Sequence, residues 1–151
     1  MSTGESVHQK GAGTERLRHK IAVVFGAGSV GPGWGNGKAT AVSFAREGAT
    51  VAAIDVNEKA AQETVAIIER EGGLAIPMRT DVTRSEQVNN VIATVVEKFG
   101  RIDVLHNNVG FGRMGGPLEL TESDWHEAID VNLTGTFLTC KAVFPVMLAQ
   151  R

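Results

Sequence analysis

The stretch of the chain best suited to binding chemistry is the glycine-rich segment 26–38. Glycine fills six of the twelve positions from Gly26 to Gly37, and none of these twelve residues is charged. Glycine permits positive φ angles and lets a ligand approach the backbone closely. A helix that begins just beyond such a loop offers free N–H groups and a positive dipole end to a phosphate. The segment therefore predicts a nucleotide pyrophosphate site, in preference to a glycine loop without a ligand.

A second candidate binding group is Asp55, which lies eighteen positions after Gly37. In a dinucleotide-binding fold, an acidic residue at this place accepts hydrogen bonds from the adenosine ribose, and its charge repels a 2′-phosphate. The next residue is Val56, so no arginine follows to bind that phosphate. Asp55 therefore favours NAD over NADP, against the alternative of a solvated aspartate at a strand end.

A Walker-type phosphate loop is a competing interpretation of the same glycines. That motif needs a glycine, four residues, and then Gly-Lys-Ser/Thr. Gly37 and Lys38 supply the pair, but Pro32 stands where the first glycine belongs and Ala39 follows the lysine. The motif thus fails at two of its positions, which disfavours an ATPase or GTPase.

The elements that must position these residues follow from the hydrophobic pattern. Short apolar runs predict strands, apolar residues at helical spacing predict helices, and a capping box at Thr121 and Asp124 opens a long last helix. Pro77 indicates that the third strand lies at an edge. The expected strands are 21–25, 50–54, 74–78 and 102–106, and the expected helices are 38–47, 58–70, 85–99 and the one that starts at Thr121. This alternation predicts an α/β fold: a Rossmann-type, doubly wound parallel sheet with strand order 3-2-1-4.

The motifs in this order resemble those of the short-chain dehydrogenase/reductase family, over about residues 20–151. The family loop Gly-x-x-x-Gly-x-Gly is matched by Gly26, Gly35 and Gly37 if 30–34 is an insertion of five residues. A second register through Gly31 and Gly33 needs a shorter insertion, but it places Asp55 too far from the helix start. The first register is preferred, and Phe25 replaces the threonine that usually precedes the first glycine. The resemblance implies that the pyrophosphate lies against Gly26, Ser29, Gly35, Asn36 and Gly37.

Further motifs extend the resemblance toward the end of the chain. Asp81 and Val82 are similar to the family pair that holds the adenine. The segment Asn107-Asn108-Val109-Gly110 resembles the family's Asn-Asn-Ala-Gly signature, which implies that Asn108, Val109 and Gly110 lie beside the nicotinamide-side ribose. Asn132 occupies the place of the family's catalytic asparagine, whose backbone binds a water of a proton relay.

The remaining catalytic groups of the family are missing from this chain. In the family a serine, a tyrosine and a lysine follow the last helix, and the tyrosine exchanges a proton as hydride moves. The 151 residues contain no tyrosine. We expect this chain to be inactive alone. We interpret His106 and His126 as ordinary polar residues and Cys140 as a small buried apolar residue, not a nucleophile.

Composition limits the possible partners. Fifteen basic and seventeen acidic residues leave a net charge of −2 without a long basic run, so we expect no nucleic-acid partner. One cysteine excludes an internal disulfide and a cysteine-cluster metal site, and no metal is expected. The uncharged stretches are short of a membrane span, and no signal-peptide core is present, so the default expectation is a cytoplasmic protein without a membrane partner.

The expected organisation is a polar, disordered arm over 1–16 and one NAD-binding domain over 17–151. The last helix carries more apolar residues than one sheet face requires, which indicates core packing, a homo-oligomer contact as in the family, or both. We expect the sequence to be the front part of a longer protein, truncated before the later strands.

The resemblance implies an NAD(H)-dependent oxidoreductase that transfers hydride between a secondary alcohol or ketone and nicotinamide. Two alternatives stay open. One is a non-catalytic nucleotide-binding or dimerisation module that is complete at 151 residues. The other is an S-adenosylmethionine methyltransferase, which the Asn-Asn-Val-Gly segment disfavours.

Overall fold

The sheet is formed as predicted. The computed structural model describes residues 14–150, and its strands form one parallel sheet in the order β3-β2-β1-β4. The strands are β1 (Ile21–Phe25), β2 (Thr50–Asp55), β3 (Leu74–Arg79) and β4 (Val104–Asn107). Pro77 lies in the edge strand β3, where a missing N–H costs no internal ladder bond. The predicted Rossmann-like α/β fold is confirmed.

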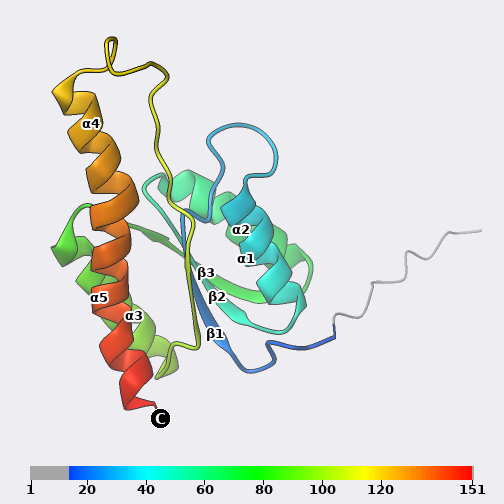
Figure 1. Ribbon diagram of the computed structural model, residues 1–151. Coiled ribbons are helices and arrows are strands. Elements are labelled where there is room, and N and C mark those ends of the chain that lie inside the picture. The colour runs from blue at the N-terminus through cyan, green and yellow to red at the C-terminus, as the bar shows by residue number, and fades with distance from the viewer. Residues whose placement is uncertain (1–13, 151) are drawn as a thin grey trace, which may run out of the picture.

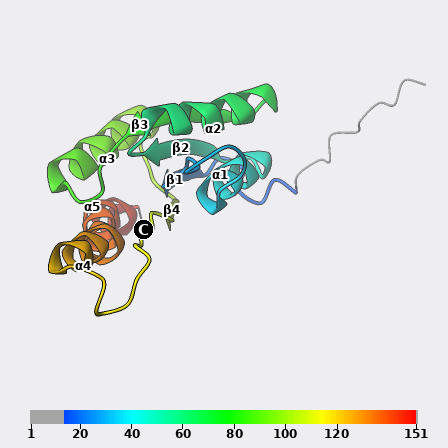
Figure 2. The same cartoon turned by 90° about the horizontal axis from the view of Figure 1, so that it is seen from above.

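Helices cover both faces of the sheet (Figures 1 and 2). α1 (Asn36–Arg46) and α2 (Glu58–Arg70) pack on one face around a core that includes Val24, Val42 and Ile68. α3 (Ser85–Phe99) and α5 (Gly135–Ala149) pack on the other face around Phe25, Val95 and Val143. The strand β1 is buried along its whole length, which explains its uninterrupted apolar sequence.

The winding of the chain reverses between β1 and β4. From β1 the chain passes through α1 to β2 and through α2 to β3; α3 then carries it back across the sheet to β4, on the other side of β1. In open α/β sheets, ligands bind outside the carboxyl ends of the strands at this switch point. The glycine-rich turn follows β1 and Asn108 follows β4, so both lie there.

The strand β4 starts two residues later than the sequence pattern indicates. The backbone N–H of Ile102 donates to the side-chain oxygen of Gln150 at 2.8 Å, and the side-chain nitrogen of Gln150 donates to the Ile102 carbonyl at 2.8 Å. Asp103 accepts a bond from the Ile21 amide through its side chain at 2.9 Å. The Gln150 side chain thus takes both backbone groups of Ile102, while the Asp103 amide still donates to the Ile21 carbonyl of β1 at 2.9 Å.

The last helix, predicted as one element, is three. α4 (Glu122–Ile129) begins with the predicted capping box between Thr121 and Asp124, and a π-helical turn, η1 (Asp130–Thr134), joins it to α5. The side chain of Asn132 donates to the Ala128 carbonyl at 2.7 Å. That carbonyl is the acceptor that an α-helix would offer to the Asn132 amide, which accounts for the local change of winding.

The stretch Glu122–Ala149 also departs from the expectation about membrane-length segments. Within residues 14–150 it is long and apolar enough to cross a bilayer by length and composition, with a mean hydropathy of 1.4 in its most apolar window. The sequence reasoning missed it because Lys141 interrupts the uncharged run. Only 17% of that window is buried.

The predicted arm, 1–16, falls mostly outside the described residues. Of its described members, Thr14 donates to the Glu47 carboxylate at 2.7 Å, and Arg16 pairs with the same carboxylate at 3.3 Å. These bonds lower the pKa of Glu47, the hydrogen bond from Thr14 contributing most. Residues 14–16 therefore attach to the end of α1.

Candidate cofactor-binding site

The glycine-rich turn brings the start of α1 against the end of β1. Gly26 has a φ of +75°, and a Cβ there would lie 3.0 Å from the Val109 amide nitrogen. A Cβ on Gly37 would collide with the Gly26 carbonyl oxygen and would lie 2.7 Å from the side-chain nitrogen of Asn108. Both positions therefore require glycine for the turn, the helix and the segment after β4 to meet.

The residues 30–34 stand out from this turn as a separate loop (Figure 1). The Ser29 hydroxyl closes the base of the loop by accepting from the Gly35 amide at 2.7 Å and donating to the Gly33 carbonyl at 3.2 Å. Gly35 is the N-cap of α1, which begins at Asn36. The geometry follows the register through Gly26, Gly35 and Gly37, with 30–34 as the insertion.

The carboxylate of Asp55 is fixed at the end of β2. One oxygen accepts from the Gly28 amide at 2.9 Å, and the other accepts from the Asn57 amide at 2.9 Å. Each oxygen keeps a second lone pair for a further donor. Arg79, the partner of Asp55 in β3, donates to the Val56 carbonyl at 3.3 Å, a neighbour that the sequence pattern does not indicate.

The pair Asp81 and Val82 lies just beyond β3. One carboxylate oxygen of Asp81 accepts from both the amide and the hydroxyl of Thr83, at 2.9 and 2.7 Å. The Asp81 amide donates to the Gln87 side chain at 3.0 Å, and Val82 is buried. The loop is therefore held by its own side chains.

Asn107, the last residue of β4, and Asn108 after it connect three elements. Asn108 donates to the Gly26 carbonyl at 3.2 Å. Asn107 accepts from the Thr139 hydroxyl of α5 at 2.8 Å and donates to the Cys140 sulfur at 3.6 Å. The two side chains thus fix the segment that carries Val109 and Gly110 against the glycine turn and the last helix.

Asn132 holds the next part of that segment. Its side chain accepts from the Phe111 amide at 3.1 Å and donates to the Phe111 carbonyl at 2.7 Å. Its own backbone carbonyl accepts from the Thr136 hydroxyl at 2.9 Å. The π-helical turn therefore presents Asn132 to the loop after β4.

These residues surround one cleft of about 1200 Å³. Two predicted site residues do not line it: Gly37, predicted to bind cofactor, and Asn132, the predicted catalytic residue. The other residues predicted to bind cofactor line it: Gly26, Ser29, Gly35, Asn36, Asp55, Asp81, Val82, Asn108, Val109 and Gly110. Gly28 and Gly35 keep their part of the wall free of side chains, since a Cβ on either would lie 3.2 Å or less from a neighbouring atom. The size, the free backbone and the carboxylate at its edge fit an adenine dinucleotide.

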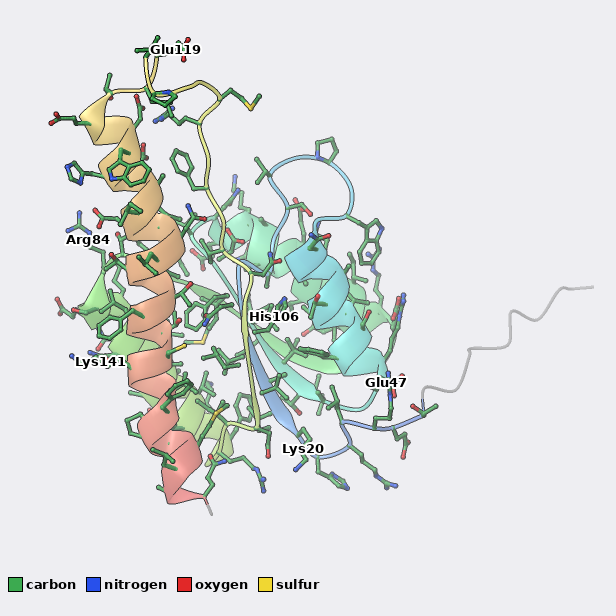
Figure 3. All side chains as sticks on the ribbon, viewed as in Figure 1. Lys20, Glu47, Arg84, His106, Glu119 and Lys141 are labelled. Carbon is green, nitrogen blue, oxygen red and sulfur yellow. The ribbon has the colours of Figure 1, made fainter. Side chains whose placement is uncertain are left out.

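His106 lies beside this site but takes no part in lining it. It projects from β4 toward α1, where its ring packs edge-on against Phe44 with centroids 6.1 Å apart (Figure 3). Its Nε2 atom is buried and has no hydrogen-bond partner among the described residues. The structure thus gives His106, interpreted as an ordinary polar residue, a packing role against α1.

A family model for short chain dehydrogenases matches residues 20–151. The chain belongs to this family. Its members use NAD or NADP as cofactor.

Curated relatives of this chain include enzymes with different substrates. A 3-oxoacyl-[acyl-carrier-protein] reductase of Thermotoga maritima is 40% identical over 136 residues, which cover 90% of this chain and 53% of the relative. A glucose 1-dehydrogenase of Bacillus subtilis is 38% identical over 87% of this chain and 50% of the relative. The chain thus spans about half the length of the curated relatives it matches.

Solved structures show the same arrangement. A short-chain dehydrogenase/reductase from Burkholderia xenovorans is 47% identical with a TM-score of 0.87, over 89% of this chain and 54% of that one. A hydroxysteroid dehydrogenase from Escherichia coli is 32% identical with a TM-score of 0.82, over 90% of this chain and 55% of that one.

Sequence reasoning missed one wall of the cleft. Phe111 and residues of α4 and η1 line it: Ser123, His126, Glu127, Asp130 and Val131. Arg113 fixes α4 near this wall through bonds to Asp124 at 2.8 Å and Glu127 at 2.9 Å. The helical spacing of Ser123, Glu127 and Asp130 could have placed them on one face, but no local motif marks that face as a binding surface. His126, which we interpreted as an ordinary polar residue, lies on this wall.

Proposed function

We propose that the chain is the NAD(H)-binding part of an oxidoreductase that transfers hydride between a secondary alcohol or ketone and nicotinamide. One observation carries this proposal: the cleft at the switch point joins the side-chain-free turn after β1 to the fixed carboxylate of Asp55. Family membership supports the reaction class, since the relatives include a reductase and several dehydrogenases.

The preference for NAD over NADP rests on charge. The charged side chains that line the cleft within the described residues are Asp55, Asp81, Glu127 and Asp130, and all four are acidic. A 2′-phosphate beside Asp55 would meet a like charge with no cation in the wall to offset it. The ribose hydroxyls of NAD would instead donate to the free lone pairs of that carboxylate.

Different residues of the cleft would bind different parts of the cofactor. The amides of the glycine turn and the first turn of α1 would hold the pyrophosphate, Asp81 and Val82 the adenine, and Asn108 to Gly110 the nicotinamide-side ribose. Bound nicotinamide would supply the acceptor or donor of hydride. Asn132 would take part in a proton relay through its backbone.

The 151 residues offer no tyrosine as the acid/base group. We therefore propose that this chain alone binds cofactor without turning over an alcohol. The same observation favours a second candidate, a non-catalytic nucleotide-binding or dimerisation module. Formation of NADH from NAD by the purified chain with a panel of secondary alcohols would contradict both statements.

The test of the cofactor proposal is a fluorescence titration with NADH and NADPH. The chain is expected to bind NADH more tightly, and Asp55→Ala is expected to weaken NADH binding by about 1–3 kcal/mol, as for a lost hydrogen bond to a charged group. Glu97→Ala, which removes the same charge from an exposed site on α3, is the matched control and should bind as the unmodified chain does. Equal or tighter binding of NADPH by the unmodified chain would contradict the role of Asp55.

We also propose a homo-oligomer in which a second copy covers the outer face of α4, η1 and α5. Large apolar side chains there are more than half exposed: Trp125, Leu133, Phe137, Phe144 and Leu148. An apolar surface of this kind usually marks an interaction site. A cytoplasmic location remains a prediction from the sequence.

A further inference from the structure

The five inserted residues 30–34, here called the strap, are not needed to build the turn. Eight residues separate Gly26 from Gly35, where the family loop has three. The bond between Ser29 and Gly35 already brings the two ends of the strap together. The turn beneath it is complete without these five residues.

The backbone of the strap is rich in unused donors. Four amides of the strap have no hydrogen-bond acceptor within residues 14–150: those of Val30, Gly31, Gly33 and Trp34. The same holds for the amide of Ser29, just before the strap, and Pro32 has no N–H. A Cβ built on Gly31 or Gly33 would meet nothing within 4 Å. The tip of the strap therefore stands clear of the body of the protein, with free N–H groups and glycines that let it bend.

The cleft beside the strap lacks positive charge. No lysine or arginine lines it within the described part of the chain, whereas four carboxylates do. A pyrophosphate in this cleft therefore depends on backbone N–H groups for its charge to be offset, and successive N–H groups form such anion sites. Val30 already lines the rim of the cleft, with its side chain fully exposed.

We propose that the strap closes over the pyrophosphate of the bound dinucleotide and adds its free amides to those at the start of α1. Val30 then covers the ribose-phosphate side of the cofactor. The inference rests on the proposed function, because it takes the dinucleotide as the ligand of the cleft.

The direct test deletes residues 30–34 and joins Ser29 to Gly35. The deletion protein is expected to bind NADH and ADP roughly tenfold more weakly or worse, as after loss of at least one charge-assisted hydrogen bond. Adenosine, which lacks the pyrophosphate, should bind both proteins equally. Equal binding of NADH by both proteins would overturn the strap alone, while failure of the unmodified chain to bind NADH would overturn the proposed function and the strap with it.

A side-chain control separates the amides from the apolar groups. Trp34→Ala removes the largest side chain of the strap, which does not line the cleft, and keeps every N–H, so NADH binding should change by less than about threefold. A loss as large as that of the deletion would show that side chains carry the effect and would contradict the amide role.

Hydrogen exchange on the unmodified chain tests the same point without a mutation. The amides of residues 29–34 are expected to exchange at least about tenfold more slowly with NAD bound, because they then donate to phosphate oxygens. Unchanged exchange in this segment, with NAD binding shown in the same sample, would overturn the proposal even if the deletion protein did not fold.

Discussion

At the scale of single residues, the site depends on glycines, whose lack of a side chain lets neighbouring segments approach closely. Gly26 and Gly37 allow the turn after β1, the start of α1 and the segment after β4 to touch one another. Asp55 is the exception, since its carboxylate both braces the turn through the Gly28 amide and faces the cleft.

Gly37→Ala tests this close approach. The added methyl would meet the Gly26 carbonyl, so we expect unfolding to be easier by about 1–3 kcal/mol, as for an overpacked core, together with weakened NADH binding. Thermal denaturation followed by circular dichroism measures the first effect. Gly31→Ala adds the same methyl in open space and should leave stability within about 0.5 kcal/mol; a loss equal to that of Gly37→Ala would contradict the packing argument.

Some residue roles were accessible from sequence and others were not. Gly26 and Gly37 lie in the turn after β1 and at the start of α1, and Asp55 ends the neighbouring strand β2. Their spacing in the sequence is therefore enough to predict that they lie together. Phe111 and Glu127 enter the same cleft only because Asn132 and Arg113 fix the loop after β4 against α4. Such contacts between distant segments leave no periodic signal.

At the scale of elements, the first strand and the fourth strand are joined at their beginnings by one carboxylate. Burial alone raises the pKa of Asp103, but hydrogen bonds from Arg101, the Ile21 amide and Lys20 outweigh burial and lower it overall. Figure 3 places Lys20 at the end of the molecule opposite Glu119, which lies in the loop before α4. Asp103 thus supports the sheet at the end remote from the cleft.

Asp103→Asn is expected to destabilise the fold by about 1–3 kcal/mol at neutral pH, as for the loss of a charge-assisted bond. A lowered native pKa means that the stabilisation is present above the ordinary carboxyl pKa of about 3.9 and is lost as pH falls below it. The difference between the two proteins should therefore shrink between about pH 5 and pH 3 in urea unfolding. A difference that stays constant over that range would contradict a role for the ionised carboxylate.

The elements themselves were largely predictable. The ranges 58–70 and 85–99 agree with α2 and α3, because apolar spacing and the glycines beyond them mark both helices. The start of β4 and the π-helical turn were missed, since both are set by single side chains, those of Gln150 and Asn132, that bond to the backbone.

At the scale of the whole molecule, the long helix formed by α4, η1 and α5 stands along one side of the sheet with its outer face uncovered by the described residues (Figures 1 and 2). Its inner face supplies Val143 to the core. The core-packing interpretation of its apolar residues therefore applies to the inner face, and the second copy that we propose would cover the outer face.

Phe137→Glu with Phe144→Glu tests the second copy. Two charges on the outer face are expected to shift the chain to monomers in light scattering coupled to size exclusion, with little change in thermal stability of the monomer, because both side chains are more than half exposed. Gln62→Glu, on the exposed side of α2, adds a charge on the opposite face of the sheet and should leave the assembly unchanged. A monomeric unmodified chain would contradict the oligomer proposal.

The most direct measurement of the central claim is an amide NMR titration of the unmodified chain with NAD. The account predicts that shifts concentrate in residues 26–37, 55–57, 80–83 and 108–111, which surround the cleft. Spectra unchanged at saturating NAD, or shifts confined to residues remote from the cleft such as Glu63 and Arg70, would contradict it.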